Sequence, residues 1–239
     1  MEQEIFPHVS PSLHPKVITA IDHYEQHKGY CGHAADALKF AYQAINDVVV
    51  ARKTVRLDET RTAKAQHLAV SGLADKYLSQ MHTKVAGSWD RLDKGITSIE
   101  KSLSKPLEEQ AGIGVVNSEI RSHAKSLSFE ERRKMINKAI RENDAKTCAA
   151  ILGAPAYISG LREDEHTVYT RQYHEATNQQ TMQRLQVMTT AKQRLEQSEK
   201  IILAEMKKAV GMSGLELQHL RDNNAAAEAA LQPKDFSDS

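Results

Sequence analysis

The sequence predicts an all-α protein with long helical, coiled-coil-like arms that form a hairpin, a small helical module between them and an extended N-terminal arm. Residues 161–210 contain neither glycine nor proline, and a single helix over all of them would be about 75 Å long. Apolar side chains recur there, and again within residues 34–105, at the three- and four-residue steps of one helical face. Aromatic residues make up only 5% of the chain, which argues against strands, because strands favour aromatic and β-branched residues.

The N-terminal arm, within residues 1–33, is predicted to be extended. Its prolines lock φ and remove backbone donors, which excludes an α-helix at the start of the chain; they are Pro7, Pro11 and Pro15. The arm also carries three apolar side chains that need burial, namely Phe6, Val9 and Leu13. They pack either on their own chain or on a neighbouring subunit that the arm clasps, so we treat them as interface candidates.

A short helix over residues 16–27, ended by Gly29 and Gly32, is expected to follow the arm. Five of the eleven histidines lie within the first 33 residues. Two of them, four positions apart, would share one helical face, with a cysteine and a third histidine close behind, and imidazole and thiolate can hold Zn²⁺. These metal candidates are His23, His27, Cys31 and His33. The alternatives are ordinary surface or interface histidines, or a pH-sensitive contact, and no cofactor is predicted.

Residues 34–105 are predicted to form the first long arm. Apolar residues follow one helical face in two stretches, which are Leu38, Ala41, Ile45, Val48 and Val55, and then Ala74, Leu78, Met81, Val85, Leu92, Ile96, Ile99 and Leu103. Residues 53–66 between the two stretches are polar. The arm is therefore either one bent helix or two or three consecutive helices.

The module between the arms, residues 106–160, is predicted to contain short helices. Ser128 and Glu131 form a capping box, which opens a helix over residues 129–141. A shorter helix is expected before the box, within residues 117–126. The core of the module is expected to consist of Ala139, Ile140, Cys148, Ala149, Ile151, Leu152, Tyr157, Ile158 and Leu161.

A turn at Asn143 and Asp144 is expected to lead into a further helix over residues 145–152. Two short helices joined by a turn raise the alternative of a DNA-reading helix-turn-helix. The second helix, however, is apolar and carries Lys146 as its one base, whereas a recognition helix needs donors to base edges. The basic face of the first helix would consist of Arg132, Arg133, Lys134, Lys138 and Arg141.

Residues 161–210 are predicted to form one long helix. The acidic residues at 163–165 and the lysines at 207–208 suit the two ends of a helix dipole. Ser159 stands where an N-cap is expected, and Gly211 stands where a helix would stop. The second half of this helix carries a regular buried seam, formed by Leu185, Met188, Ala191, Leu195, Ser198, Ile202, Glu205 and Ala209.

The first half of the same helix, within residues 170–186, is polar and rich in glutamine. A helix without an apolar face needs a partner helix, another subunit or many side-chain hydrogen bonds. This half is either a solvated part of a hairpin arm or a polar subunit contact, whose candidate residues are Tyr173, Gln179, Gln183 and Gln186. Residues 211–239 are expected to add a helix over residues 215–231 and a tail.

Composition and motifs argue against several classes of protein. The net charge is +1, so the chain as a whole shows no nucleic-acid or membrane signature. No apolar run approaches the roughly 18–20 residues of a membrane span, and the start lacks the regions of a signal peptide. Two cysteines do not make a disulfide framework, which favours a reducing compartment. Phosphate-binding loops, nucleophile elbows and zinc-protease motifs do not occur, so no enzyme is predicted.

Residues 149–161 read Ala-Ala-Ile-Leu-Gly-Ala-Pro-Ala-Tyr-Ile-Ser-Gly-Leu. This stretch resembles a segment of uncharacterised helical proteins from bacteriophage and prophage structural gene clusters; the resemblance extends over residues 140–166 and carries no functional residues. It implies a virion head, connector, tail or internal protein, or a scaffold. We therefore expect a non-enzymatic structural or assembly protein, in the virion or the host cytoplasm, that contacts copies of itself or other virion proteins. The alternatives are a nucleic-acid-associated helical protein and a cellular coiled-coil adaptor.

Overall fold

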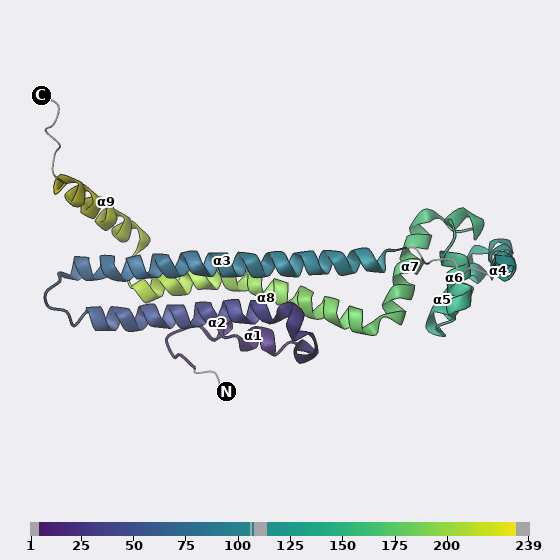
Figure 1. The fold of residues 1–239 in the computed structure, drawn as a ribbon, viewed down its shortest axis with the longest axis horizontal. Helices are drawn as coiled ribbons and strands as arrows, with labels where there is room; N and C mark the ends of the chain where they lie inside the picture. The colour runs from purple at the N-terminus through teal and green to yellow at the C-terminus, as the bar shows by residue number, and fades with distance from the viewer. Residues whose placement is uncertain (1–4, 106, 108–113, 233–239) are drawn as a thin grey trace, which may run out of the picture. The chain divides into compact units, whose positions relative to one another are not determined.

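The computed structural model describes residues 5–105, 107 and 114–232, and it confirms the all-α fold (Figure 1). No strand occurs among these residues, and none of their helices is long and apolar enough to cross a membrane. Two short 3-10 helices are η1 (Pro11–Leu13) and η2 (Ala156–Ile158). The α-helices are α1 (Lys16–Thr19), α2 (Tyr24–Val55), α3 (Ala63–Leu103), α4 (Gly114–Ser126), α5 (Phe129–Arg141), α6 (Ala145–Leu152), α7 (Glu163–Thr177), α8 (Gln179–Val210) and α9 (Gly214–Ala230).

The chain divides into two compact units. The first comprises Met1–Leu92 together with Thr190–Ser239, and the second comprises Asp93–Thr189. These units do not coincide with the five predicted segments, because α3 and α8 each contribute residues to both units.

Three long helices form the first unit: α2 and the parts of α3 and α8 that belong to it (Figure 1). Two hydrogen bonds show that α2 and α3 run antiparallel. The Ser88 hydroxyl donates to the carbonyl of His33 at 3.0 Å. The Tyr77 hydroxyl donates to the carboxylate of Asp47 at 3.2 Å. Most residues of the predicted apolar seams are buried, and the fully buried large side chains of the first unit include Leu38, Ile45, Met81, Leu92, Leu195 and Met206.

Residues 34–105 lie in two helices rather than one bent helix. Asp58 organises the loop between α2 and α3. Its carboxylate accepts a hydrogen bond from the backbone N–H of Thr60 at 3.0 Å, and its carbonyl accepts one from the side chain of Gln66 at 2.9 Å. Short polar side chains that bond to nearby backbone compete with helix formation, so the chain turns within the stretch predicted to be polar.

The N-terminal arm packs on its own chain. Val9 and Leu13 are buried. Phe6 is half-buried and stacks on Tyr42 with ring centroids 5.0 Å apart, and its backbone N–H donates to the Tyr42 hydroxyl at 2.8 Å. Phe6, Val9 and Leu13 therefore contribute to the fold of their own chain, and their role at an interface between chains stays a prediction.

The prediction of a helix over residues 16–27 is wrong. α1 ends at Thr19, His23 has a positive φ of 61°, and α2 begins at Tyr24 and continues through both glycines that were expected to stop it. Tyr24 and Cys31 in the first turns of α2 are buried. Burying such side chains outweighs the cost of about 1 kcal/mol that each glycine imposes on a helix.

The prediction of a single helix over residues 161–210 is also wrong. The chain leaves helical geometry at Asn178, where φ is −122° and ψ is 53°. The Asn178 side chain donates to the carbonyl of His174 at 2.9 Å. An asparagine that takes up a backbone acceptor favours a helix end, and here no continuous apolar face opposes the break. Two helices, α7 and α8, therefore replace the predicted rod.

The predicted ends of that rod have different outcomes. Ser159 is not an N-cap: it is buried, and its hydroxyl donates to the carbonyl of Ile151 at 3.1 Å. Arg162 occupies the N-cap position of α7, and its backbone N–H donates to Glu165 at 2.9 Å. The predicted stop at Gly211 is confirmed, since α8 ends there with a positive φ of 74°.

The second unit contains the small module, with α7 packed on α5 and α6. The capping box of Ser128 and Glu131 is confirmed. Asp144 caps α6 by accepting from the backbone N–H of Thr147 at 3.1 Å, also as predicted. α4 begins earlier than predicted, at Gly114. The core of the module consists of Ala124, Ile136, Ala139, Ile140, Cys148, Ile151, Leu152, Ala156, Leu161 and Tyr169.

Tyr157 and Ile158, which were predicted to lie in this core, are 68% and 37% exposed. The short helix η2 directs Ala156 inward instead, and Ala156 is almost completely buried. The backbone N–H of Leu161 donates to the carbonyl of Ala156 at 2.9 Å. In this turn the first residue is thus buried and the next two side chains face outward.

Arg132 connects parts of the module and does not belong to a basic outer face. Its guanidinium donates to the carbonyl oxygens of Ala124 and Leu127, each at 2.8 Å, and to that of Gly160. The last carbonyls of a helix lack helical partners, so a cation at the end of α4 satisfies them. Residues 148–152 of α6 are all buried, so α6 cannot serve as the recognition helix of a helix-turn-helix.

Replacing Gly160 with alanine is expected to lower the free energy of unfolding by about 1–2 kcal/mol. Gly160 has a φ of 74°, and an added Cβ would lie 3.1 Å from Cζ of Arg132. Urea unfolding followed by circular dichroism measures the change. Gly72→Ala is the matched control, because a Cβ on this helical glycine meets nothing within 4 Å and should stabilise the helix by about 0.5–1 kcal/mol. Unchanged stability of Gly160→Ala would contradict this account.

Candidate functional site

The structure does not bring the four predicted metal candidates together. His23 precedes α2 and His27 has non-helical backbone angles (φ −115°, ψ 15°), so the two do not share a helical face. Cys31 is buried, and its thiol donates to the carbonyl of His27 at 3.4 Å. Within the described ranges, no group of three or more His, Cys, Asp or Glu side chains is placed to hold a metal ion. Of the four, His33 lines a pocket between α2 and α3.

The two cysteines are buried and poorly suited to chemistry. Burial, followed by the charge of Glu25, raises the pKa of Cys31 to about 11. Burial, followed by the charge of Asp144, raises the pKa of Cys148 to about 11. The thiolate is the nucleophile and the metal ligand, so neither side chain supplies one at neutral pH.

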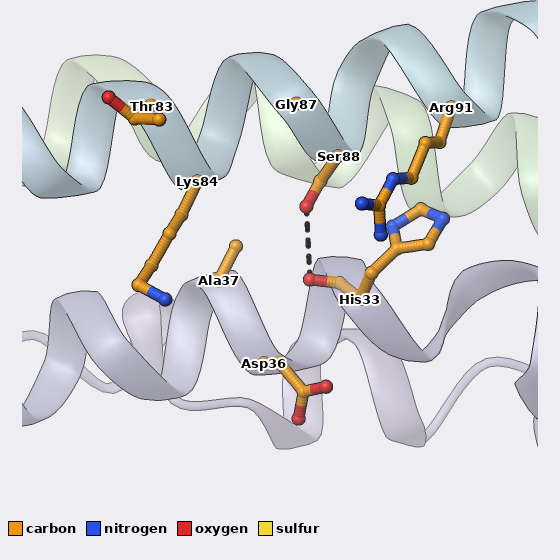
Figure 2. A pocket seen from close by; sticks show the side chains of 8 residues that line it. All are labelled: His33, Asp36, Ala37, Thr83, Lys84, Gly87, Ser88 and Arg91. Carbon is orange, nitrogen blue, oxygen red and sulfur yellow. Dashed lines mark hydrogen bonds between the residues drawn. The ribbon is translucent and has the colours of Figure 1, made fainter.

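A pocket of about 320 Å³ lies between α2 and α3 in the first unit (Figure 2). Small-molecule sites begin at about this size. Polar and charged side chains from both helices line the pocket, together with two small residues. The lining residues are His33, Asp36, Ala37, Thr83, Lys84, Gly87, Ser88 and Arg91.

Two cations on α3 flank this pocket. Lys84 lies over the ring of Phe40, with Nζ 4.9 Å from the ring centroid. Arg91 extends beside the imidazole of His33 (Figure 2). Within the part of the chain that the structure describes, neither Lys84 nor Arg91 forms an ion pair with a carboxylate. Both charges are therefore free to meet a bound anion.

His33 and Asp36 form the α2 side of the pocket. Burial, followed by the positive charge of Arg91, lowers the pKa of His33 below its usual 6.5, while the Tyr30 carbonyl and Asp36 act in the opposite direction. His33 Nδ1 is buried and makes no hydrogen bond to a described residue. The pocket thus offers a neutral imidazole, one carboxylate and two cations at neutral pH.

Sequence reasoning missed this pocket although its pattern is visible. Lys84, Gly87, Ser88 and Arg91 follow the three- and four-residue steps of one helical face, as do His33, Asp36 and Ala37. The signal becomes specific only when the antiparallel pairing of α2 and α3 is known, because the two sets lie about fifty residues apart in the chain.

The glutamine-rich contact remains a prediction. Tyr173 is half-buried and packs against the core of the second unit. Gln179 and Gln186 are exposed and Gln183 is half-buried. The three glutamines thus lie in the first turns of α8, with their polar side chains fully or partly exposed to solvent.

Helix α9 has no buried residue. Its start is well formed, because Ser213 and Glu216 make a capping box. Arg221 pairs with Asp75 of α3, but both side chains are substantially exposed, and such pairs contribute little to stability. Leu215 and Leu231 are 81% and 83% exposed.

A mainly apolar groove of about 190 Å³ lies where the first turns of α9 meet α3 and α8. Leu203, one of its lining residues, is half exposed. The apolar residues of the groove are Ala74, Leu78, Leu203, Met206, Val210, Met212 and Leu217. This end of the first unit therefore combines exposed apolar side chains on α9 with an apolar groove beside it.

Both thiols are expected to react slowly with a chromogenic disulfide at pH 8 while the protein is folded. With pKa values of about 11, only about a thousandth of each is thiolate at that pH. The rate should rise as the pH approaches 11, and both thiols should react at once in guanidinium. Cys148→Ser serves as the control that assigns any residual signal. Rapid reaction of one thiol in the folded protein at pH 8 would contradict the burial described above.

No protein-family model, curated protein or solved structure matches this chain. The resemblance of residues 140–166 to phage structural proteins therefore stays a prediction.

Proposed function

We propose that this chain is a non-enzymatic structural or assembly protein that acts through helix-mediated contacts between copies of itself, with α9 as the main contact helix. The observation that supports the proposal is that no residue of α9 is buried. Its packing on its own chain is limited to partly buried residues such as Leu217, which lines the groove, whereas most helical stability in proteins comes from tertiary packing of an apolar face. A second molecule packed against α9 supplies the missing burial.

The exposed leucines at the two ends of α9 give this contact its driving force. Leu215 and Leu231 are more than four-fifths exposed. Full burial of a leucine side chain contributes roughly 1.5–3 kcal/mol. The groove formed by α3, α8 and the start of α9 extends the apolar surface along the same end of the first unit.

The charge distribution favours a second copy as the partner. Residues 211–239 carry a net charge of −3, with two basic and five acidic side chains, while residues 34–105 carry a net charge of +4, with twelve basic and eight acidic side chains. Complementary charge steers association and fixes orientation. The acidic end of one chain thus suits the basic helices α2 and α3 of another.

A bacteriophage particle is the proposed setting of this assembly, as a head, connector, tail or internal component. This part of the proposal rests on the resemblance of residues 140–166 alone. Copurification with phage particles tests it, and absence of the chain from purified particles would remove the virion setting while leaving self-association in place.

Association with nucleic acid is the second candidate function. α5 presents Arg133, Lys134, Lys138 and Arg141 at its exposed surface, and a basic stripe attracts phosphate backbones. Gel-shift experiments across a salt series distinguish this candidate, because a chain that binds no DNA or RNA at low salt does not act in this way.

Light scattering after size-exclusion chromatography is expected to show that the full chain is an oligomer, with a mass at least twice the 26.7 kDa of one chain. The double variant Leu215→Glu and Leu231→Glu is expected to shift that mass towards the monomer, because it places charge where apolar contact is proposed. Both positions are exposed, so the helical circular dichroism signal should be retained.

Leu57→Glu is the matched control. Leu57 is 81% exposed, as Leu215 is, but it lies in the loop between α2 and α3. Its substitution should leave the mass unchanged. A full chain that is monomeric at high concentration, or a double variant with an unaltered oligomer mass, would overturn the proposal for α9.

A further inference from the structure

We infer that the pocket between α2 and α3 is a binding site for the phosphate group of a small phosphorylated molecule. This site is separate from the contact helix α9 and does not depend on the proposed assembly. It lies wholly within the first unit, so both of its walls have defined relative positions.

The cations of α3 determine the class of ligand. Lys84 and Arg91 are seven residues apart, which places them about 10.5 Å apart along the helix axis on the same face. The guanidinium of Arg91 offers a planar pair of donors that matches two phosphate oxygens, and the ammonium of Lys84 offers a mobile point charge. Neither has a carboxylate partner among the described residues, so anion binding breaks no existing ion pair.

The α2 wall restricts what surrounds the phosphate. Asp36 is the one carboxylate that lines the pocket. Its negative charge repels a ligand in which all polar groups are anionic. It can accept a hydrogen bond from a hydroxyl or amino group next to the phosphate, as a phosphate ester of a small polyol provides. A site with two cations and one carboxylate therefore fits a phosphate monoester better than a plain polyanion.

His33 adds a buried polar group to the lining of the pocket. Its Nδ1 is buried without a hydrogen bond to a described residue. An imidazole can donate from one ring nitrogen when neutral and from both when protonated. An anion bound between His33 and Arg91 gives this nitrogen a hydrogen-bond partner. Its negative charge also offsets the positive charge of Arg91, which lowers the pKa of His33.

Gly87 leaves the space that the ligand needs. It sits between Lys84 and Arg91 on the pocket face of α3 (Figure 2). An added Cβ there would meet nothing within 4 Å, so a larger side chain can occupy the pocket without straining the helix. Ser88 beside it is fixed by its hydrogen bond to the carbonyl of His33, which holds the two walls together.

The test is calorimetric titration of the full chain with inorganic phosphate and, separately, with glycerol 3-phosphate, at constant ionic strength and pH 7.5. Both probes are expected to bind saturably, with the ester tighter. Arg91→Gln should weaken both by about tenfold or more, since a charge-assisted hydrogen bond is worth roughly that factor in affinity. Asp36→Asn should reduce the preference for the ester over inorganic phosphate.

Gly87→Leu should abolish binding of both probes by filling the pocket. Gly72→Leu is the matched control, because Gly72 is also a helical glycine of α3 whose Cβ meets nothing within 4 Å, and it does not line the pocket. Its affinity should equal that of the unaltered chain. Circular dichroism confirms that each variant is folded.

Three outcomes would overturn the inference. The first is that neither probe binds saturably up to tens of millimolar. The second is that affinity is the same in Gly87→Leu as in Gly72→Leu. The third is that only an oligonucleotide binds with sensitivity to Arg91→Gln, which would assign the cations to a nucleic-acid backbone instead of a small ligand.

Discussion

The first unit depends on the apolar side chains that its three long helices bury against one another. The stripes of α2, α3 and α8 meet in one shared seam, whose members include Ile45, Met81 and Leu195. Where the seam carries a serine, the hydroxyl is satisfied by a backbone carbonyl, as Ser198 shows with Arg194 at 2.8 Å. The pocket and the groove lie beside the seam and combine buried residues, such as Ala37 and Met206, with exposed ones, such as Lys84 and Leu203.

The way α8 ends explains why no residue of α9 is fully buried. Gly211 adopts a positive φ of 74°, and the guanidinium of Arg52 lies where a side chain at this position would be. Arg52 donates to the carbonyl of Lys208 at 2.9 Å and so satisfies one of the last free acceptors of α8. The chain turns away from the seam at this point, and the next helix starts with its own cap at Ser213. α9 is thus a helix specified by local signals without a place in the core.

The parts of the fold that could be predicted are those that local chemistry decides. The seam from Leu185 to Ala209, the capping box at Ser128 and the cap at Asp144 depend on spacing and on side chains within a few residues. The helix break at Asn178 and the positive φ at His23 depend on which side chains find burial elsewhere. A glycine or an asparagine only lowers the local propensity for helix, and tertiary packing decides whether the helix continues through that residue.

Long-range contacts account for the rest. Arg132 looked like a solvent-facing base, yet it binds carbonyls of Ala124 and Gly160, eight and twenty-eight residues away. The pocket could not be predicted for the same reason: contacts between residues far apart in the chain are not visible in the sequence. Its two walls form one site only because α2 and α3 pack against each other. Helical spacing could show that Lys84 and Arg91 share a face, but not that His33 would stand opposite them.

Because the seam carries the stability of the first unit, its outer faces are free to serve binding. Arg91, Lys84 and Asp36 contribute no seam contact, and Leu215 and Leu231 contribute none either. Substitutions at exposed positions of this kind usually change stability by no more than about 0.5 kcal/mol. A loss of ligand affinity or of oligomer mass in such variants therefore reports on the binding surface itself. The seam and the two surfaces can be separated by experiment because they use different residues: the pocket lies beside the seam between α2 and α3, and the proposed contact surface lies on α9.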